Sequence, residues 1–177
     1  MKLSEDAKEW IKDIAFSVVF AAVVLFFVKP TIVREHSMEN TLHNNDYLFL
    51  SRQAYTLFGE PERGDIIVFK SNLTTSGGKQ KLLIKRIIGL EGDTVTITGG
   101  VVYLNGEALE EDYTKDGVTL TEMKEVTVPA GELFVMGDNR QNSADSRSEQ
   151  VGTVGVDTVV GKAVFRLFPF NKIGGLY

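Results

Sequence analysis

The pattern of apolar and polar positions divides the chain into one long apolar run and a series of short alternating stretches. The run extends from Ile14 to Val28 and is apolar except for Ser17. At ~1.5 Å per helical residue it covers roughly 22 Å, short of the ~30 Å hydrocarbon core of a bilayer. Lys12 and Lys29 flank the run and can reach the headgroups by extending their side chains. We therefore predict a single membrane-spanning helix.

Two other interpretations of the run compete with an anchor: a cleavable signal peptide and a buried core helix. A signal peptide is disfavoured because acidic residues are frequent in the preceding segment, and no small-x-small cleavage site follows. A core helix is disfavoured because such a helix keeps a polar face at helical spacing, and this run has none. Lysine and arginine are divided too evenly across the run to fix its orientation.

After Pro30 the chain reads as short stretches of β-branched and aromatic residues separated by glycine-rich turns. The sequence therefore predicts a mainly β fold with an antiparallel sheet, organised as a tail and anchor over 1–29 and one domain over 30–177. Tight turns at Gly99-Gly100 and Asn105-Gly106 indicate a small β-hairpin insert subdomain over 93–131. Polar residues over 71–80 predict a mobile loop. The predicted strands are 47–51, 65–70, 81–88, 94–98, 101–104, 125–128, 132–136 and 159–168.

Composition excludes several classes of function. The formal net charge of -5 argues against nucleic acid as a partner, because phosphate binding needs a basic surface. The chain has no cysteine, so disulfides, thiolate metal sites and cysteine nucleophiles are excluded, and we expect neither metal nor cofactor. Only His36 and His43 can supply an imidazole, and both lie too close to Ser37 in sequence for an easy Ser-His-Asp triad.

Ser37 and Lys85 are the candidate nucleophile and general base. A serine hydroxyl needs a base to remove its proton, and Lys85 lies among aliphatic residues in Leu83-Ile84-Lys85-Arg86-Ile87-Ile88. Burial disfavours the charged ammonium, so such a lysine can act as a base. Taken alone, Lys85-Arg86 also fits a charged pair that protects a strand edge from aggregation.

A dense polar segment over 137–147 follows an apolar strand. Alternation along the lysine strand points Arg86 to the opposite face from Lys85, where it can meet a carboxylate. The segment is either a solvated loop or, together with Arg86, part of a buried ionic network that orients Lys85. The charged residues concerned are Asp138, Asp145, Arg86 and Arg147.

In this order and behind an N-terminal anchor, these segments resemble the bacterial type I signal peptidases, which are membrane-bound serine proteases. The resemblance rests on His36-Ser37-Met38-Glu39-Asn40-Thr41-Leu42, Arg63-Gly64-Asp65-Ile66-Ile67-Val68-Phe69, the Lys85 strand and 137–147. It implies a Ser37–Lys85 dyad, with Ser143 hydrogen-bonded to the lysine, salt bridges from Asp138, Asp145 and Arg147, and Gly137 in the backbone of the site. Arg86 occupies the position that follows the family's catalytic lysine.

The resemblance also implies which substrates the protein acts on and where it is located, and the sequence departs from the family's pattern at two positions. Substrates are preproteins that carry signal peptides, the N-terminus is cytoplasmic, the catalytic domain is extracytoplasmic beside the lipid bilayer, and the protein acts as a monomer. Glu35 replaces a serine that adds an oxyanion donor in some members, and Asn40 replaces the usual proline. We expect strand edges and shallow pockets for substrate at Ile32, Val33, Met38, Phe69, Leu83 and Ile84, although core packing fits Met38 equally well.

Two further functions stay open. A self-cleaving repressor of the related Ser-Lys fold would carry an N-terminal DNA-binding domain in place of the anchor. A catalytically silent, membrane-anchored β adaptor would hold Ser37 and Lys85 only incidentally. The leading prediction is an endopeptidase that binds the extended end of a signal peptide as an added strand and cleaves after a small residue.

Overall fold

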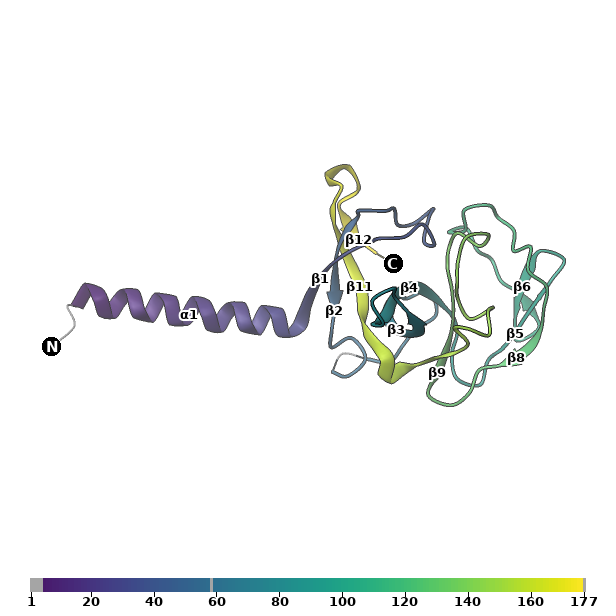
Figure 1. Cartoon of the computed structure of the whole chain (residues 1–177), viewed down its shortest axis with the longest axis horizontal. Helices are drawn as coiled ribbons and strands as arrows, with labels where there is room; N and C mark the ends of the chain where they lie inside the picture. The colour runs from purple at the N-terminus through teal and green to yellow at the C-terminus, as the bar shows by residue number, and fades with distance from the viewer. Residues whose placement is uncertain (1–4, 58, 177) are drawn as a thin grey trace.

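A long N-terminal helix leads directly into a β domain, as Figure 1 shows for the computed structural model, which describes residues 5–57 and 59–176. The helix α1 runs over Glu5–Phe27, and its apolar side chains are exposed; Phe16, for example, is 73% exposed. Its 23 residues span roughly 34 Å, enough for the ~30 Å core of a bilayer. Within residues 5–57 and 59–176 none of the helix's apolar span is buried, so the interpretation as a buried core helix is wrong. Its length exceeds the apolar run because the charged flank is helical as well.

The β domain contains two antiparallel sheets, which confirms the mainly β fold. The larger sheet has the order β1-β2-β11-β3-β4-β9-β10, with β12 paired to β11, and the smaller has the order β7-β6-β5-β8. The smaller sheet lies at the end of the domain away from α1 (Figure 1), within the segment predicted as an insert. The strands are β1 (Val28–Ile32), β2 (Tyr47–Ser51), β3 (Ile66–Thr74), β4 (Gln80–Gly89), β5 (Thr94–Thr98), β6 (Val101–Leu104), β7 (Glu107–Ala108), β8 (Met123–Thr127), β9 (Glu132–Met136), β10 (Val154–Gly155), β11 (Val159–Phe168) and β12 (Gly174–Gly175). Two short 3-10 helices, η1 (Val156–Thr158) and η2 (Phe170–Lys172), flank β11.

The expected loop over 71–80 is shorter in the structure: residues 75–79 connect β3 to β4, whereas 71–74 belong to β3 and Gln80 begins β4, so the predicted bounds are wrong. β3 continues to Thr74, and the register shifts between Lys70 and Thr74. Ser71 explains why polar residues stay in the strand: its hydroxyl donates to the carbonyl of Lys81 at 2.8 Å and accepts from the amide of Leu73 at 3.3 Å. Side-chain hydrogen bonds thus replace the regular ladder at the bulge.

Three apolar clusters hold the sheets together and place the site. One lies against β2, β3 and β11, a second covers the opposite side of β3, β4 and β9, and a third joins the two sheets. Gly89 permits the third contact, since a Cβ there would lie 3.2 Å from Val95 and 3.3 Å from Phe134. The clusters are built around Met38, Leu42, Leu50 and Val68; around Ile67, Phe69, Ile87 and Val135; and around Ile88, Val95, Ile97 and Phe134.

Strand β4 changes its number of neighbours along its length. It pairs with β3 from Gln80 to Arg86, but β9 pairs only with Arg86, Ile87 and Gly89. Among the residues that the structure describes, the stretch from Gln80 to Lys85 therefore has one side without a strand partner. Lys85 lies where this open edge ends and the interior of the sheet begins.

Candidate active site

Ser37 lies on the loop that joins β1 to β2, and its side chain contacts that of Lys85 in β4. Lys85 Nζ donates to Ser37 Oγ at 2.7 Å and to the carbonyl of Ile84 at 2.9 Å. Ser37 is 5% exposed and Lys85 is 1% exposed, so water is largely kept from the contact. His36 instead contacts Glu39 through Nδ1 at 2.5 Å. The structure thus pairs the serine with the lysine and not with an imidazole.

Burial lowers the pKa of Lys85 from 10.5 to about 8. The carboxylates of Asp145 and Glu35 oppose this change by favouring the ammonium, whereas the nearby charges of Lys81 and Arg147 reinforce it. With this pKa, roughly a tenth of the molecules hold a neutral amine at pH 7, against about one in three thousand for an ordinary lysine. The site therefore supplies a usable base near neutral pH.

The loop that carries Ser37 is held by two buried apolar side chains and by hydrogen bonds from the polar segment. Met38 and Leu42 are fully buried in the first apolar cluster, and the amide of Leu42 donates to the carbonyl of Met38 at 2.7 Å. From the polar segment, the amide of Asn139 donates to the carbonyl of Ser37 at 3.0 Å, and Asn139 Nδ2 donates to that of His36 at 3.1 Å. These bonds hold the hydroxyl of Ser37 in place before any substrate arrives.

Arg86 and Asp138 form a bidentate, buried ion pair behind the dyad. Arg86 Nε donates to Asp138 Oδ1 at 2.9 Å and Nη2 to Oδ2 at 2.8 Å. The hydroxyl of Thr41, from the Ser37 loop, donates to the same carboxylate at 2.5 Å. Arg86 also donates to the carbonyl of Gly64 at 2.9 Å. The pair thereby joins the lysine strand, the serine loop and the polar segment. Of the two carboxylates that the sequence left open for Arg86, the structure places Asp138 beside it.

Asp145 and Arg147 form a second buried pair, separate from the first. Arg147 donates through Nε and Nη2 to the two carboxylate oxygens of Asp145, at 2.8 Å each, and the amide of Gly137 donates to Asp145 Oδ2 at 2.9 Å. A Cβ at Gly137 would lie 2.4 Å from the carbonyl oxygen of Ser37, a distance that real Cβ atoms do not reach. Gly137 therefore lets the polar segment approach the nucleophile. The four charges form two pairs and not one network.

Ser143 lies next to Gly137, but its hydroxyl forms no hydrogen bond with Lys85. A Cβ at Gly137 would be 2.3 Å from Ser143 Oγ, which places the hydroxyl beside the dyad. Within residues 5–57 and 59–176, Ser143 Oγ is buried and has no hydrogen-bond partner. The Ser143–Lys85 bond implied by the resemblance is therefore absent, because Lys85 donates to Ser37 and to the carbonyl of Ile84 instead.

A third ion pair escapes sequence reasoning. Arg140 Nη1 donates to Glu111 Oε2 at 2.7 Å and to the hydroxyl of Thr119 at 2.8 Å, and Arg140 Nε donates to the carbonyl of Gly137 at 3.1 Å. The ring of Tyr113 lies 4.1 Å from the guanidinium of Arg86. Segments near the smaller sheet thus support the polar segment, and nothing local in the sequence marks Glu111 as a partner.

The residues expected to contact substrate divide into two groups. Ile32 and Ile84 are half-buried, and the carbonyl of Ile84 accepts from Lys85, whereas the side chains of the other four are buried. For these four, contact between the side chain and a substrate stays a prediction. Val33 and Met38 pack in the first apolar cluster, and Phe69 and Leu83 pack in the second.

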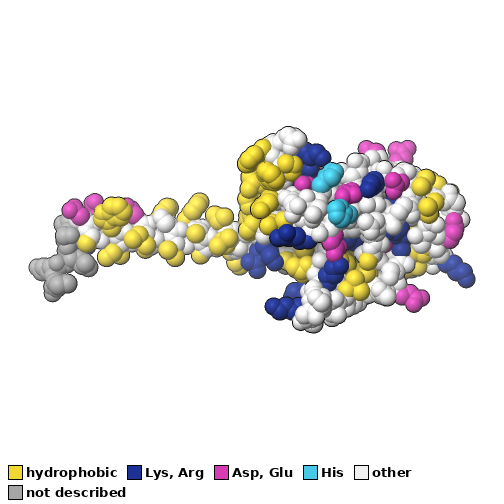
Figure 2. Space-filling model, turned by 45° about the horizontal axis from the view of Figure 1, so that its top comes forward, with side chains coloured by type: hydrophobic (Ala, Val, Ile, Leu, Met, Phe, Trp, Pro, Cys, Tyr) yellow, Lys and Arg dark blue, Asp and Glu magenta, His cyan; other side chains and the backbone are white. Residues whose placement is uncertain are grey.

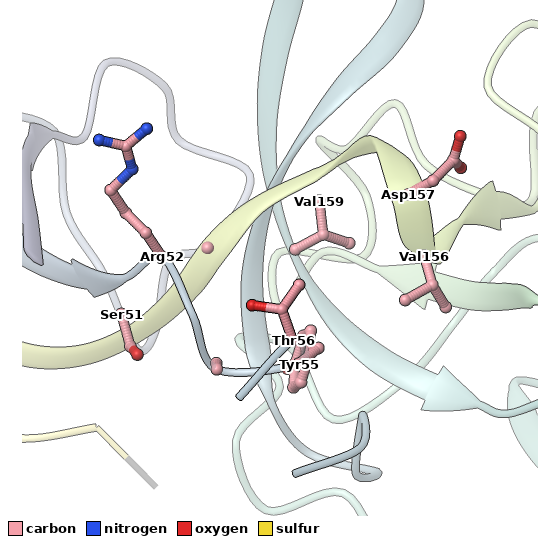
Figure 3. Close-up of a pocket in the computed structure, with 9 residues that line it drawn as sticks. Ser51, Arg52, Tyr55, Thr56, Val156, Asp157 and Val159 are labelled. Atoms are coloured by element: carbon pink, nitrogen blue, oxygen red, sulfur yellow. The ribbon is translucent and has the colours of Figure 1, made fainter. Parts of the chain in front are cut away.

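The hollow in Figure 3, of about 310 Å³, lies away from the dyad between Arg52, Thr56 and Val159. Across residues 5–57 and 59–176, no cluster of three or more His, Asp or Glu side chains is placed to hold a metal ion. The chemistry available at the site is thus that of a buried hydroxyl beside a lysine whose pKa is lowered.

Comparison with known proteins relates this arrangement to a family. The family described as "Signal peptidase, peptidase S26" matches residues 7–168. Signal peptidase I of Bacillus licheniformis is 38% identical over 93% of this chain and 90% of its own length, and that of Leptolyngbya laminosa is 40% identical over 99% and 86%. A solved signal peptidase I from Enterococcus faecalis is 34% identical, with a TM-score of 0.48 over 58% of this chain and 96% of that one. The matching family and the close relatives show that the chain belongs to the peptidase S26 family of signal peptidases.

Proposed function

We propose that the protein is a membrane-anchored endopeptidase that removes signal peptides from exported preproteins, with Ser37 as nucleophile and Lys85 as general base. The observation that carries the proposal is the 2.7 Å contact between a buried lysine of lowered pKa and a buried serine hydroxyl. Family membership supplies the substrate class, since the relatives are named signal peptidases.

The chemical steps follow from this contact. Neutral Lys85 accepts the proton of Ser37 as Oγ attacks the scissile carbonyl, and the ammonium then gives that proton to the departing amine. Lys85 next removes a proton from the water that attacks the acyl-enzyme and returns it to Ser37 Oγ as the ester bond breaks, which restores the neutral amine. The backbone amide of Ser37 is the oxyanion donor that we assign. Glu35 forms an ion pair with Lys81 at 2.5 Å and, as a carboxylate, offers no second donor.

Substrate binds as an added strand along the open edge of β4. This edge ends at Lys85, so a peptide paired with Leu83 and Ile84 brings its scissile carbonyl toward Ser37. The side chains at the first and third positions before the cut then share one face, and we propose that the half-buried Ile32 and Ile84 restrict these positions to small residues. The second position points away and tolerates many residue types.

The helix α1 is the anchor in this proposal. It is long and apolar enough to cross a bilayer, with a mean hydropathy of 2.1, and the described residues contain no second such helix. We assign the N-terminus to the cytoplasm, the β domain to the outer surface of the cell membrane, and a monomer as the active form. These assignments rest on the family resemblance.

Cleavage of a preprotein with an Ala-x-Ala site by the full-length protein in detergent, read by product mass, tests the proposal. Ser37→Ala and Lys85→Ala should each abolish cleavage, and their losses should not add in the double variant. Ser76→Ala and Lys79→Ala, in the exposed β3–β4 loop, are matched controls that should cleave normally. Wild-type protein that neither cleaves nor reacts with a serine-directed probe would favour the silent adaptor, and cleavage by Lys85→Ala would exclude the dyad.

A further inference from the structure

Sixteen lysine and arginine residues follow α1, and eight of them form ion pairs with carboxylates. Among the eight that have no such pair within residues 5–57 and 59–176, Lys29, Arg52 and Lys70 are distinguished by sharing one site. These three line a single hollow of about 410 Å³. The paired residues are Arg63, Lys81, Arg86, Lys115, Arg140, Arg147, Lys162 and Arg166.

The hollow lies where α1 meets the β domain. The amide of Arg52 donates to the carbonyl of Phe27 at 2.9 Å, and Arg52 Nη1 donates to that of Leu25 at 3.3 Å, so Arg52 is fastened to the last turn of the helix. Lys29 follows the helix directly in β1, and Lys70 reaches the hollow from β3. Figure 2 shows Lys and Arg side chains gathered at this junction. Three cations therefore surround the point where the anchor leaves the domain.

One carboxylate shares the hollow but does not neutralise it. Asp157 lines the hollow, yet it forms no ion pair with any of the three cations described there. Figure 3, which views the adjoining hollow, shows Arg52 and Asp157 on opposite sides, with the guanidinium directed away from Tyr55 and Thr56. The site keeps a net positive charge, with the forked donors of Arg52 available to a tetrahedral oxyanion.

The hollow also has an apolar side. Leu82, the cross-strand neighbour of Lys70, is 48% exposed and forms part of its wall. Three cations beside an exposed aliphatic side chain, at the end of a helix long and apolar enough to span a bilayer, match a phospholipid whose phosphate lies in the headgroup layer and whose chains lie in the hydrocarbon. A free anion would satisfy the cations but not the apolar wall or the position beside the helix.

We propose that Lys29, Arg52 and Lys70 bind the phosphate of one anionic phospholipid headgroup, such as phosphatidylglycerol, where α1 enters the β domain. The site rests on the proposed anchoring by α1 but not on the proteolytic chemistry, because neither Ser37 nor Lys85 takes part. A headgroup bound here attaches the β domain to the bilayer at a second point besides the helix. The open edge of β4 is then held near the membrane surface from which a signal peptide emerges.

Native mass spectrometry of the full-length protein in detergent, titrated with phosphatidylglycerol or phosphatidylcholine, tests the site. Wild-type protein should bind phosphatidylglycerol preferentially, and the double variant Lys29→Gln/Lys70→Gln should lose about 25-fold in affinity, at about fivefold for each cation removed. Lys79→Gln/Lys124→Gln carries the same charge change at exposed lysines outside the hollow and should stay within about twofold of wild type. Lys29→Arg/Lys70→Arg keeps the charge and should bind phosphatidylglycerol as wild type does. This comparison distinguishes loss of the site's charge from loss of the fold.

Equal binding of both lipids, or unchanged binding by the Gln double variant, would overturn the lipid site. Displacement of the lipid by inorganic phosphate at equal concentration would also overturn it, because it would indicate a site for free anions. Cleavage of a soluble peptide is measured on the same samples and should persist in the Gln double variant. An inactive wild-type protein that still binds phosphatidylglycerol through Lys29 and Lys70 would support the lipid site and reject the proposed protease.

Discussion

Replacing the buried Lys85 by methionine should abolish cleavage and yet stabilise the protein at pH 7. In the folded protein the pKa of Lys85 is about 8, against 10.5 for a free lysine, so protonating it in the folded state is penalised. A tenfold change in a protonation constant is worth ~1.4 kcal/mol, which makes the penalty ~3 kcal/mol at pH 7. Methionine has a similar size and no charge, so it removes the penalty.

The substitution also removes two hydrogen bonds, to Ser37 Oγ and to the carbonyl of Ile84. Losing them costs about 1–2 kcal/mol, so the net stabilisation expected at pH 7 is about 1–2 kcal/mol. The sign of the stability difference between Lys85→Met and wild type must change with pH. Because the folded pKa lies below the unfolded one, the penalty is complete below about pH 8 and disappears as the pH rises toward 10.5. Near pH 10.5 only the lost hydrogen bonds remain, and Lys85→Met should be the less stable protein.

Urea unfolding of the full-length protein in mild detergent, followed by the β signal in circular dichroism at pH 7, 9 and 10.5, measures this difference. Lys79→Met makes the same chemical change at an exposed lysine of the β3–β4 loop and should leave the free energy of unfolding unchanged at each pH. A Lys85→Met protein less stable than wild type at pH 7, or a stability difference that does not vary with pH, would refute the lowered pKa and with it the base.

Three more outcomes are expected. Gly137→Ala should abolish cleavage and lower the free energy of unfolding by about 1–3 kcal/mol, because its Cβ would lie 2.4 Å from the carbonyl oxygen of Ser37. Gly77→Ala, whose Cβ meets nothing closer than 3.9 Å, is the control, and equal stability of the two variants would contradict the close approach. Arg86→Met or Asp138→Leu alone should cost about 3–5 kcal/mol and the pair together clearly less than the sum; additive losses in urea unfolding would show that the two side chains act separately. The rate constant kcat/KM should rise about tenfold per pH unit up to about pH 8 and then level off, as Lys85 loses its proton; a flat profile from pH 6 to 9 would exclude a lysine base.

Local pattern was sufficient for five of the strands, whereas β1, β7, β10 and β12 were not predicted. The strands Tyr47–Ser51, Thr94–Thr98, Val101–Leu104, Glu132–Met136 and Val159–Phe168 begin and end where the sequence predicts. In each of them β-branched and aromatic residues alternate between glycine or polar turns, so neighbouring residues alone decide the conformation. Ser37 and Lys85 were proposed without a structure because their segments resemble the motifs of the signal peptidase family; taken alone, Lys85-Arg86 also fitted a charged pair that protects a strand edge.

Tertiary structure alone decided which charges pair, which side chains are buried and where the open edge lies. Glu111 and Arg140 meet only because the two sheets pack together, and the two carboxylates of the polar segment bind different arginines. The side chain of Phe69 faces the core, since burial depends on which face of a curled sheet another element covers. Contacts between residues far apart in the chain follow from strand register and layer packing, which no local pattern of residues records.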